Sequence, residues 1–192
     1  MFQYRTGYWF RSLPRLLWSQ QTQMTLNTLT LIIDHNNLSL TDMTQVKCEV
    51  KGVFVAIGNT ATVPLVILID GNERHLPIFI GIWEAVSINS AQIKEVMPRP
   101  FTHDLFIDLC AKFAITMKYL QIDSIEDGVY YAQLVMSSGQ KQEYIDCRPS
   151  DGIALALRGD IPIFVEECVL KTAGQKPEEL PDMVDLVTFL QK

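Results

Sequence analysis

One order of sequence patterns occurs twice between Gln45 and Leu157: three strand-like segments, then a helix-like segment. In the first set, polar and apolar side chains alternate, or the segment is almost continuously apolar. Asp70-Gly71-Asn72 is a strong signal for a hairpin turn. Apolar residues that start at Trp83 then recur at helical spacing. The strand-like segments of this set are residues 47–57, 62–69 and 75–80, and the helix-like segment is residues 83–96.

The second set follows the first by about 65 to 67 residues when Ile80 is laid on Ile145. Its strand-like segments are residues 116–122, 129–136 and 142–146, and its helix spans residues 149–157. This order predicts an α+β fold, a single domain built from a duplicated three-strand-plus-helix unit. We expect mixed or antiparallel sheets packed on helices.

Other segments complete the predicted domain. A helix over residues 103–113 is expected between the two sets, with Leu105, Phe106, Leu109 and Phe113 as its buried face. A strand over residues 161–165 and a short helix over residues 166–173 close the domain. We therefore predict a poorly ordered leader over residues 1–42, the domain over residues 43–174, and an acidic tail with a short helix over residues 175–192.

Composition limits the classes of function. The chain of 192 residues has a net charge of -6, which argues against a nucleic-acid protein that uses a broad basic face. No run of apolar residues is long enough for a membrane-spanning helix. The four cysteines are widely spaced and contain no C-x-x-C pair, so they are interpreted as core thiols, and the location as cytoplasmic.

Two polar clusters stand where a loop or strand turns into a helix. One is the run from Arg99 to Leu105, and the other is the run from Asp146 to Asp151. The N-terminus of a helix presents free N–H groups and a partial positive charge, so a phosphate can bind there without a basic patch. The predicted phosphate-binding residues are Arg99, Thr102, Arg148 and Ser150.

The same clusters contain groups suited to hydrolysis of a phosphodiester. Such hydrolysis needs an activated water and neutralisation of the developing charge, which a divalent cation (Mg²⁺ or Mn²⁺) held by carboxylates commonly supplies. Glu84, Asp104, Asp146 and Asp151 are the candidate ligands. His103 could act as general acid or base, so the predicted catalytic residues are His103, Asp104 and Asp151.

Each of these residues also has a structural explanation. Thr102, Ser150 and Asp151 are typical capping or first-turn residues, and Arg148 could pair with Asp146 or Asp151 as a structural bridge. Glu84 is a candidate only because the repeat register places it opposite Asp151. We expect Trp83 in the core, His75 at the surface, and Glu166-Glu167 at a solvated helix start.

The two clusters resemble the signature segments of a known family. The strings RPFTHDL and DCRPSDGIALALR, followed by IPIFVEE, are similar to those of the bifunctional nuclease family, which read close to RPxTHDL and DARPSDAIALALR. The similarity covers about residues 46–174 and implies nuclease activity on DNA and RNA. Cys147 and Gly152 stand where alanine is usual in the family.

Two hypotheses of function follow. The first is a metal-assisted nuclease that hydrolyses phosphodiester bonds of DNA and RNA, favoured by clustered carboxylates beside a histidine. The alternative is a non-catalytic module that binds a phosphate-bearing ligand or a nucleic-acid end, favoured by the acidic net charge. The expected partners are DNA and RNA substrates without a membrane, and a homo-oligomer is left open.

Overall fold

The computed structural model describes residues 44–58, 61–96 and 98–191. The predicted leader over residues 1–42 therefore lies outside the described residues. Among the helices of the described segments, none has both the length and the hydropathy that crossing a membrane requires.

The first half of the domain is an antiparallel meander followed by a helix. β1 (Gln45–Ile57) pairs with β2 (Thr62–Asp70), which pairs with β3 (His75–Phe79). The Asp70 carboxylate accepts hydrogen bonds from the Asn72 and Arg74 N–H groups, which closes the predicted turn. α2 (Ile82–Gln92) comes next.

The second half has the same order of elements after one additional helix, α3 (Thr102–Lys112). β4 (Ile115–Glu126), β5 (Val129–Ser138) and β6 (Lys141–Cys147) form an antiparallel meander. α4 (Pro149–Gly159) follows directly. The origin of the two halves by duplication stays a prediction.

A short central strand, β7 (Ile163–Glu166), joins the two meanders into one sheet. It pairs antiparallel with β1 and parallel with β4, so the strand order is β3-β2-β1-β7-β4-β5-β6. With β8 paired to β1, this is an eight-stranded mixed sheet. The predicted α+β class with a mixed sheet packed on helices is confirmed.

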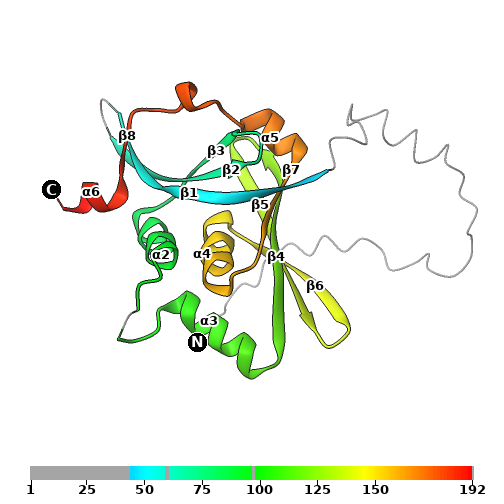
Figure 1. Ribbon diagram of the computed structural model, residues 1–192. Helices are drawn as coiled ribbons and strands as arrows, with labels where there is room; N and C mark the ends of the chain where they lie inside the picture. The colour runs from blue at the N-terminus through cyan, green and yellow to red at the C-terminus, as the bar shows by residue number, and fades with distance from the viewer. Residues whose placement is uncertain (1–43, 59–60, 97, 192) are drawn as a thin grey trace, which may run out of the picture. The chain divides into compact units, whose positions relative to one another are not determined.

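The main core lies between the sheet and a layer of helices. α2 and α4 lie side by side against one face of the sheet, with α3 next to α4 (Figure 1). Their inward faces are apolar: Ala85 and Ile88 of α2 and Ile153 of α4 are fully buried. Gly152 allows α4 to lie against Leu120 of β4, because a β-carbon there would overlap the Leu120 side chain.

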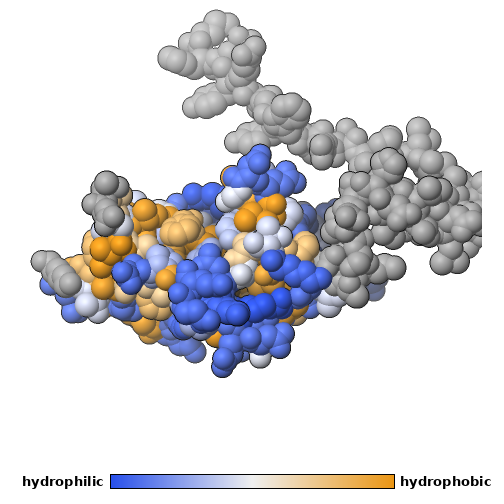
Figure 2. Space-filling model, turned by 90° about the horizontal axis from the view of Figure 1, so that it is seen from above, coloured by the Kyte–Doolittle hydropathy of each residue, from blue (hydrophilic) through white to orange (hydrophobic). Residues whose placement is uncertain are grey.

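The sheet continues beyond Gly174. After α5 (Glu167–Ala173) and a 3₁₀ turn, η2 (Pro177–Glu179), the strand β8 (Met183–Asp185) pairs with β1. α6 (Leu186–Leu190) then buries Leu186 completely. Figure 2 shows apolar residues gathered over the end of the sheet that carries β8, with hydrophilic residues over the middle of this face.

Several predicted burial states were wrong. Trp83 is 80% exposed, and Leu105, Leu109 and Phe113 of α3 are also largely exposed. Of the predicted face, Phe106 does pack against the core, together with Ile107 and Cys110.

The predicted exposure of charged and titratable side chains near β3 was also wrong. His75 is buried, with its Nε2 atom 2.7 Å from Lys51 Nζ. Glu166 is buried, and Glu167 makes a bidentate ion pair with Arg74 at 2.8 Å. Strand pairing and ion pairs with segments distant in the sequence cover these residues.

Candidate functional site

The candidate site lies at the start of α4, where β6 turns into the helix. Arg148 is the N-cap residue, Pro149 occupies the first helical position, and the Gly152 N–H donates to the Arg148 carbonyl at 3.0 Å. Proline suits this position because its missing N–H would have no partner inside the helix. The Ser150 side chain is buried and makes no capping hydrogen bond, so its predicted capping role is not seen.

The Arg148 guanidinium joins α4 to α2. Its Nε and Nη2 atoms donate to the two carboxylate oxygens of Asp151 at 2.8 and 3.0 Å, and Nη1 donates to Glu84 Oε1 at 2.9 Å. Hydrogen bonds and charge from Asp151, followed by those from Glu84, raise the pKa of Arg148. The side chain is still 65% exposed, so it can reach a ligand in solvent.

His103 of α3 is held between α2 and α4. Its Nδ1 atom lies 3.0 Å from Ser87 Oγ, and its Nε2 atom lies 3.4 Å from Asp151 Oδ1. The imidazole is thus flanked by a hydroxyl and a carboxylate. A carboxylate in this position fixes the orientation of the ring.

A second ion pair lies about two helical turns further along α4, at the interface of the three helices. Arg158 Nε donates to Asp104 Oδ1 at 2.6 Å, and Arg158 Nη1 donates to the carbonyls of Ser87 and Ala154 at 3.1 Å. Burial would raise the pKa of Asp104, but the Phe101 N–H and the Arg158 side chain outweigh burial and lower this pKa. Asp104, and not Thr102, therefore accepts the hydrogen bond at the start of α3.

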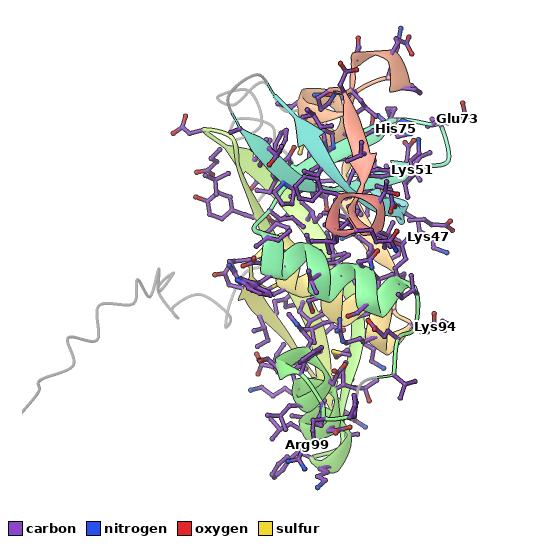
Figure 3. All side chains as sticks on the ribbon, turned by 90° about the vertical axis from the view of Figure 1, so that its left-hand side faces the viewer. Lys47, Lys51, Glu73, His75, Lys94 and Arg99 are labelled. Carbon is purple, nitrogen blue, oxygen red and sulfur yellow. The ribbon has the colours of Figure 1, made fainter. Side chains whose placement is uncertain are left out.

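Three of the predicted residues lie apart from this network. Arg99 is exposed and points outward near the bottom of Figure 3, below Lys94. Thr102 is also exposed, on α3. Asp146 is exposed on β6, where it lies opposite Gln133. The two signature segments nevertheless meet, because His103 and Asp104 come from one and Arg148 and Asp151 from the other.

The carboxylates do not fit the predicted cation site as they are arranged. Both oxygens of Asp151 and of Asp104 already accept hydrogen bonds, and Glu84 Oε1 accepts from Arg148. Over the described ranges, no three His, Cys, Asp or Glu side chains are grouped so as to hold a metal ion.

Two residues of the network were not singled out from the sequence. Ser87 follows Glu84 by three residues and Arg158 follows Asp151 by seven, so each pair shares one face of its helix. This spacing is the signal that could have identified them, since Arg158 also ends the string DCRPSDGIALALR.

Comparisons with known proteins agree with the two segments. Residues 66–178 match the family model described as the bifunctional nuclease domain. An uncharacterized protein of Mycobacterium tuberculosis is 39% identical over 127 residues, which are 66% of this chain and 76% of that protein. Bifunctional nuclease 1 of Oryza sativa and bifunctional nuclease 2 of Arabidopsis thaliana are each 26% identical over 110 residues, which are 56% of this chain and 33% of those proteins.

Proposed function

Because the chain belongs to the bifunctional nuclease domain family, we propose that it is a nuclease that hydrolyses phosphodiester bonds of DNA and RNA. One observation carries the proposal. Asp151 Oδ1 lies 3.4 Å from His103 Nε2 and 3.0 Å from Arg148 Nη2, so one carboxylate holds an acid–base group beside an anion-binding group.

Arg148 supplies the phosphate contact. Its guanidinium is planar and always charged, so it can bind two phosphate oxygens at once. It is also the most exposed cation of the network, whereas only 9% of the Arg158 side chain is exposed. A substrate phosphate therefore meets Arg148 first and competes with Asp151 and Glu84 for its N–H groups.

His103 supplies proton transfer. In hydrolysis the oxygen of a water molecule bonds to phosphorus, and the bond from phosphorus to one sugar oxygen breaks. We assign His103 to take a proton of the attacking water, while the leaving sugar oxygen, on the opposite side of the phosphorus, takes its proton from solvent. Asp151 stabilises the imidazolium formed in this step, while Ser87 holds the opposite ring nitrogen.

The charge of the network sets a condition for binding. The carboxylates of Glu84, Asp104 and Asp151 face only two guanidiniums, so the carboxylates of the network outnumber its guanidiniums by one. A substrate phosphate therefore approaches Arg148 against the negative charge of its neighbours, and binding should depend on how far the phosphate displaces them.

The test is cleavage of labelled single- and double-stranded DNA and RNA by the full-length chain. Each reaction is run with Mg²⁺, with Mn²⁺ and with a chelator. Cleavage that persists in the chelator would agree with carboxylates that pair with arginines and hold no cation. His103→Asn should lose cleavage, while Arg99→Ala, a change outside the network, should keep it. Equal activity of His103→Asn and the parent would remove the assigned role of His103.

The alternative function is a binding module without turnover. The mutual pairing of the site's arginines and carboxylates favours it, because both oxygens of Asp104 and Asp151 are already engaged. A parent chain that binds the oligonucleotides and leaves them intact with every cation would establish this alternative.

A further inference from the structure

A cavity of about 470 Å³ opens beside Arg148. We call it the base cavity. It lies between the end of β3, the β4–β5 turn and the start of α4, and its lining includes Phe79, Gly81, Glu84, Val129, Arg148 and Ser150. A cavity of this size is in the range that small organic ligands occupy in proteins.

Large apolar side chains at the base cavity are left in water. Phe79 and Val129 are each 57% exposed, and Trp83 is 80% exposed. Gly81 and Glu84 line the cavity, and the exposed Trp83 lies between them along the chain, in the first turn of α2. A cluster of exposed apolar side chains around a hollow is typical of a binding surface, because burying these side chains is favourable.

The base cavity combines two chemistries within one hollow. Phe79 and Val129 offer apolar contact, and Phe79 offers a ring face, whereas Arg148 offers a guanidinium that binds phosphate oxygens. A nucleotide has the matching pair of groups, since a flat base and a charged phosphate are joined by one sugar. A purely apolar molecule would make no use of the guanidinium.

We propose that the base cavity binds an unpaired nucleobase of single-stranded DNA or RNA, with the neighbouring phosphate on Arg148 and Trp83 stacked on an adjacent base. This inference rests on the proposed nuclease function and names its substrate as a single strand. A base inside a duplex is stacked on both sides and paired at its edge, so it cannot enter the cavity unless it leaves the helix.

The experiment measures binding, so that it does not depend on cleavage. Fluorescence anisotropy measures the affinity of the chain of 192 residues for three labelled oligonucleotides of the same length. They are a single-stranded DNA, a single-stranded RNA and a blunt duplex. The variants are Trp83→Ala and Phe79→Ala, with Trp83→Phe as the conservative change. Phe113→Ala is the matched control, because Phe113 is a 67% exposed aromatic residue beyond the end of α3.

The parent should prefer single strands to the duplex. Trp83→Ala and Phe79→Ala should each weaken single-strand binding by about 5- to 100-fold, the range of one base–aromatic stack. Trp83→Phe should stay within about threefold of the parent, and Phe113→Ala should not change the affinity. Because all these side chains are exposed, unchanged melting temperatures are expected and verify the fold.

Several outcomes would overturn the proposal. Equal parent affinity for duplex and single strand, loss of affinity no greater than in Phe113→Ala, or no binding of any oligonucleotide would each do so. Sedimentation without oligonucleotide covers one further case: a parent dimer that becomes a monomer in Trp83→Ala would assign this surface to a second copy of the chain. If the chain binds single strands through Trp83 but cleaves none, the base cavity is supported and the nuclease function is removed. If the chain cleaves nucleic acid and the variants bind like the parent, the nuclease function is supported and the base cavity is removed.

Discussion

Asp104 Oδ1 lies 2.6 Å from Arg158 Nε, and this ion pair ties the first signature segment to the last turn of α4. Only 9% of the Arg158 side chain is exposed, so its N–H groups rely on this carboxylate and on two backbone carbonyls as acceptors. Asp104 directly follows His103 in α3, so this ion pair also helps to hold the turn of α3 that carries His103.

Asp104→Asn should destabilise the fold by about 1 to 3 kcal/mol, the cost of leaving a largely buried charged group without its partner. Glu84→Gln is the matched control, because Glu84 pairs with the exposed Arg148 and such surface pairs contribute about 0 to 1 kcal/mol. Urea unfolding at pH 7 measures both free energies of unfolding. Equal losses for the two variants would contradict the assigned role of the Asp104–Arg158 pair.

Stability should fall in acid. Burial would raise the pKa values of Asp70 and Asp104, but hydrogen bonds and arginine charges outweigh burial and lower both, and Arg74 lowers the pKa of Glu167. A lowered folded-state pKa stabilises the fold fully above the unfolded value, near ~4, and this contribution is lost as the pH falls through the folded value.

The urea midpoint should therefore change little between pH 7 and pH 5 and fall below about pH 4. Asp104→Asn removes one of the three groups, so its midpoint should fall less than that of the parent between pH 5 and pH 3. Parallel pH profiles of the two chains would show that Asp104 does not contribute to this dependence.

Arg148 and Asp151 should separate binding from cleavage. Asp151→Asn leaves the phosphate contact in place but no longer stabilises a protonated His103, so cleavage should drop by about 10²-fold or more while affinity changes little. Arg148→Ala should weaken binding by about 1 to 3 kcal/mol and lower the salt dependence by about one phosphate contact.

Arg99→Ala is the control for Arg148→Ala, since Arg99 is an exposed arginine outside the network. Single-turnover cleavage and anisotropy titrations over a range of salt concentrations give the two quantities. Only variants that melt near the parent temperature are compared. An Asp151→Asn chain that cleaves at the parent rate would reduce Asp151 to a structural partner of Arg148.

Gly152→Ala should not stabilise α4, although alanine raises helix propensity by about 1 kcal/mol. The added β-carbon would overlap Leu120 Cδ1 and lie 3.2 Å from Cys147 Sγ. Overpacking of this kind costs about 1 to 3 kcal/mol, so we expect a net loss of up to about 2 kcal/mol. Thermal unfolding of the single variants and of Gly152→Ala/Leu120→Val tests the contact, because relief by the smaller side chain should make the two changes non-additive.

Local features of the fold could be predicted from the sequence because their causes are local. The turn at Asp70-Gly71-Asn72 and the start of α4 at Arg148-Pro149 depend on a few neighbouring residues. The alternation of side chains placed the strands, and the α+β class followed from the order of the patterns. The two polar segments were also recognisable, because their residue types suit phosphate chemistry wherever they lie.

The tertiary structure decided which of those residues meet. Glu84 and Arg148 are 64 residues apart, and only the packing of α2 beside α4 brings them to 2.9 Å, while Arg99 stays outside the network. The exposure of Trp83 and the burial of His75 likewise depend on which face of α2 and which end of β3 other elements cover. A local pattern states which side chains are apolar or charged, but contacts between distant segments determine which of them lose water, and that loss sets both the core and the site.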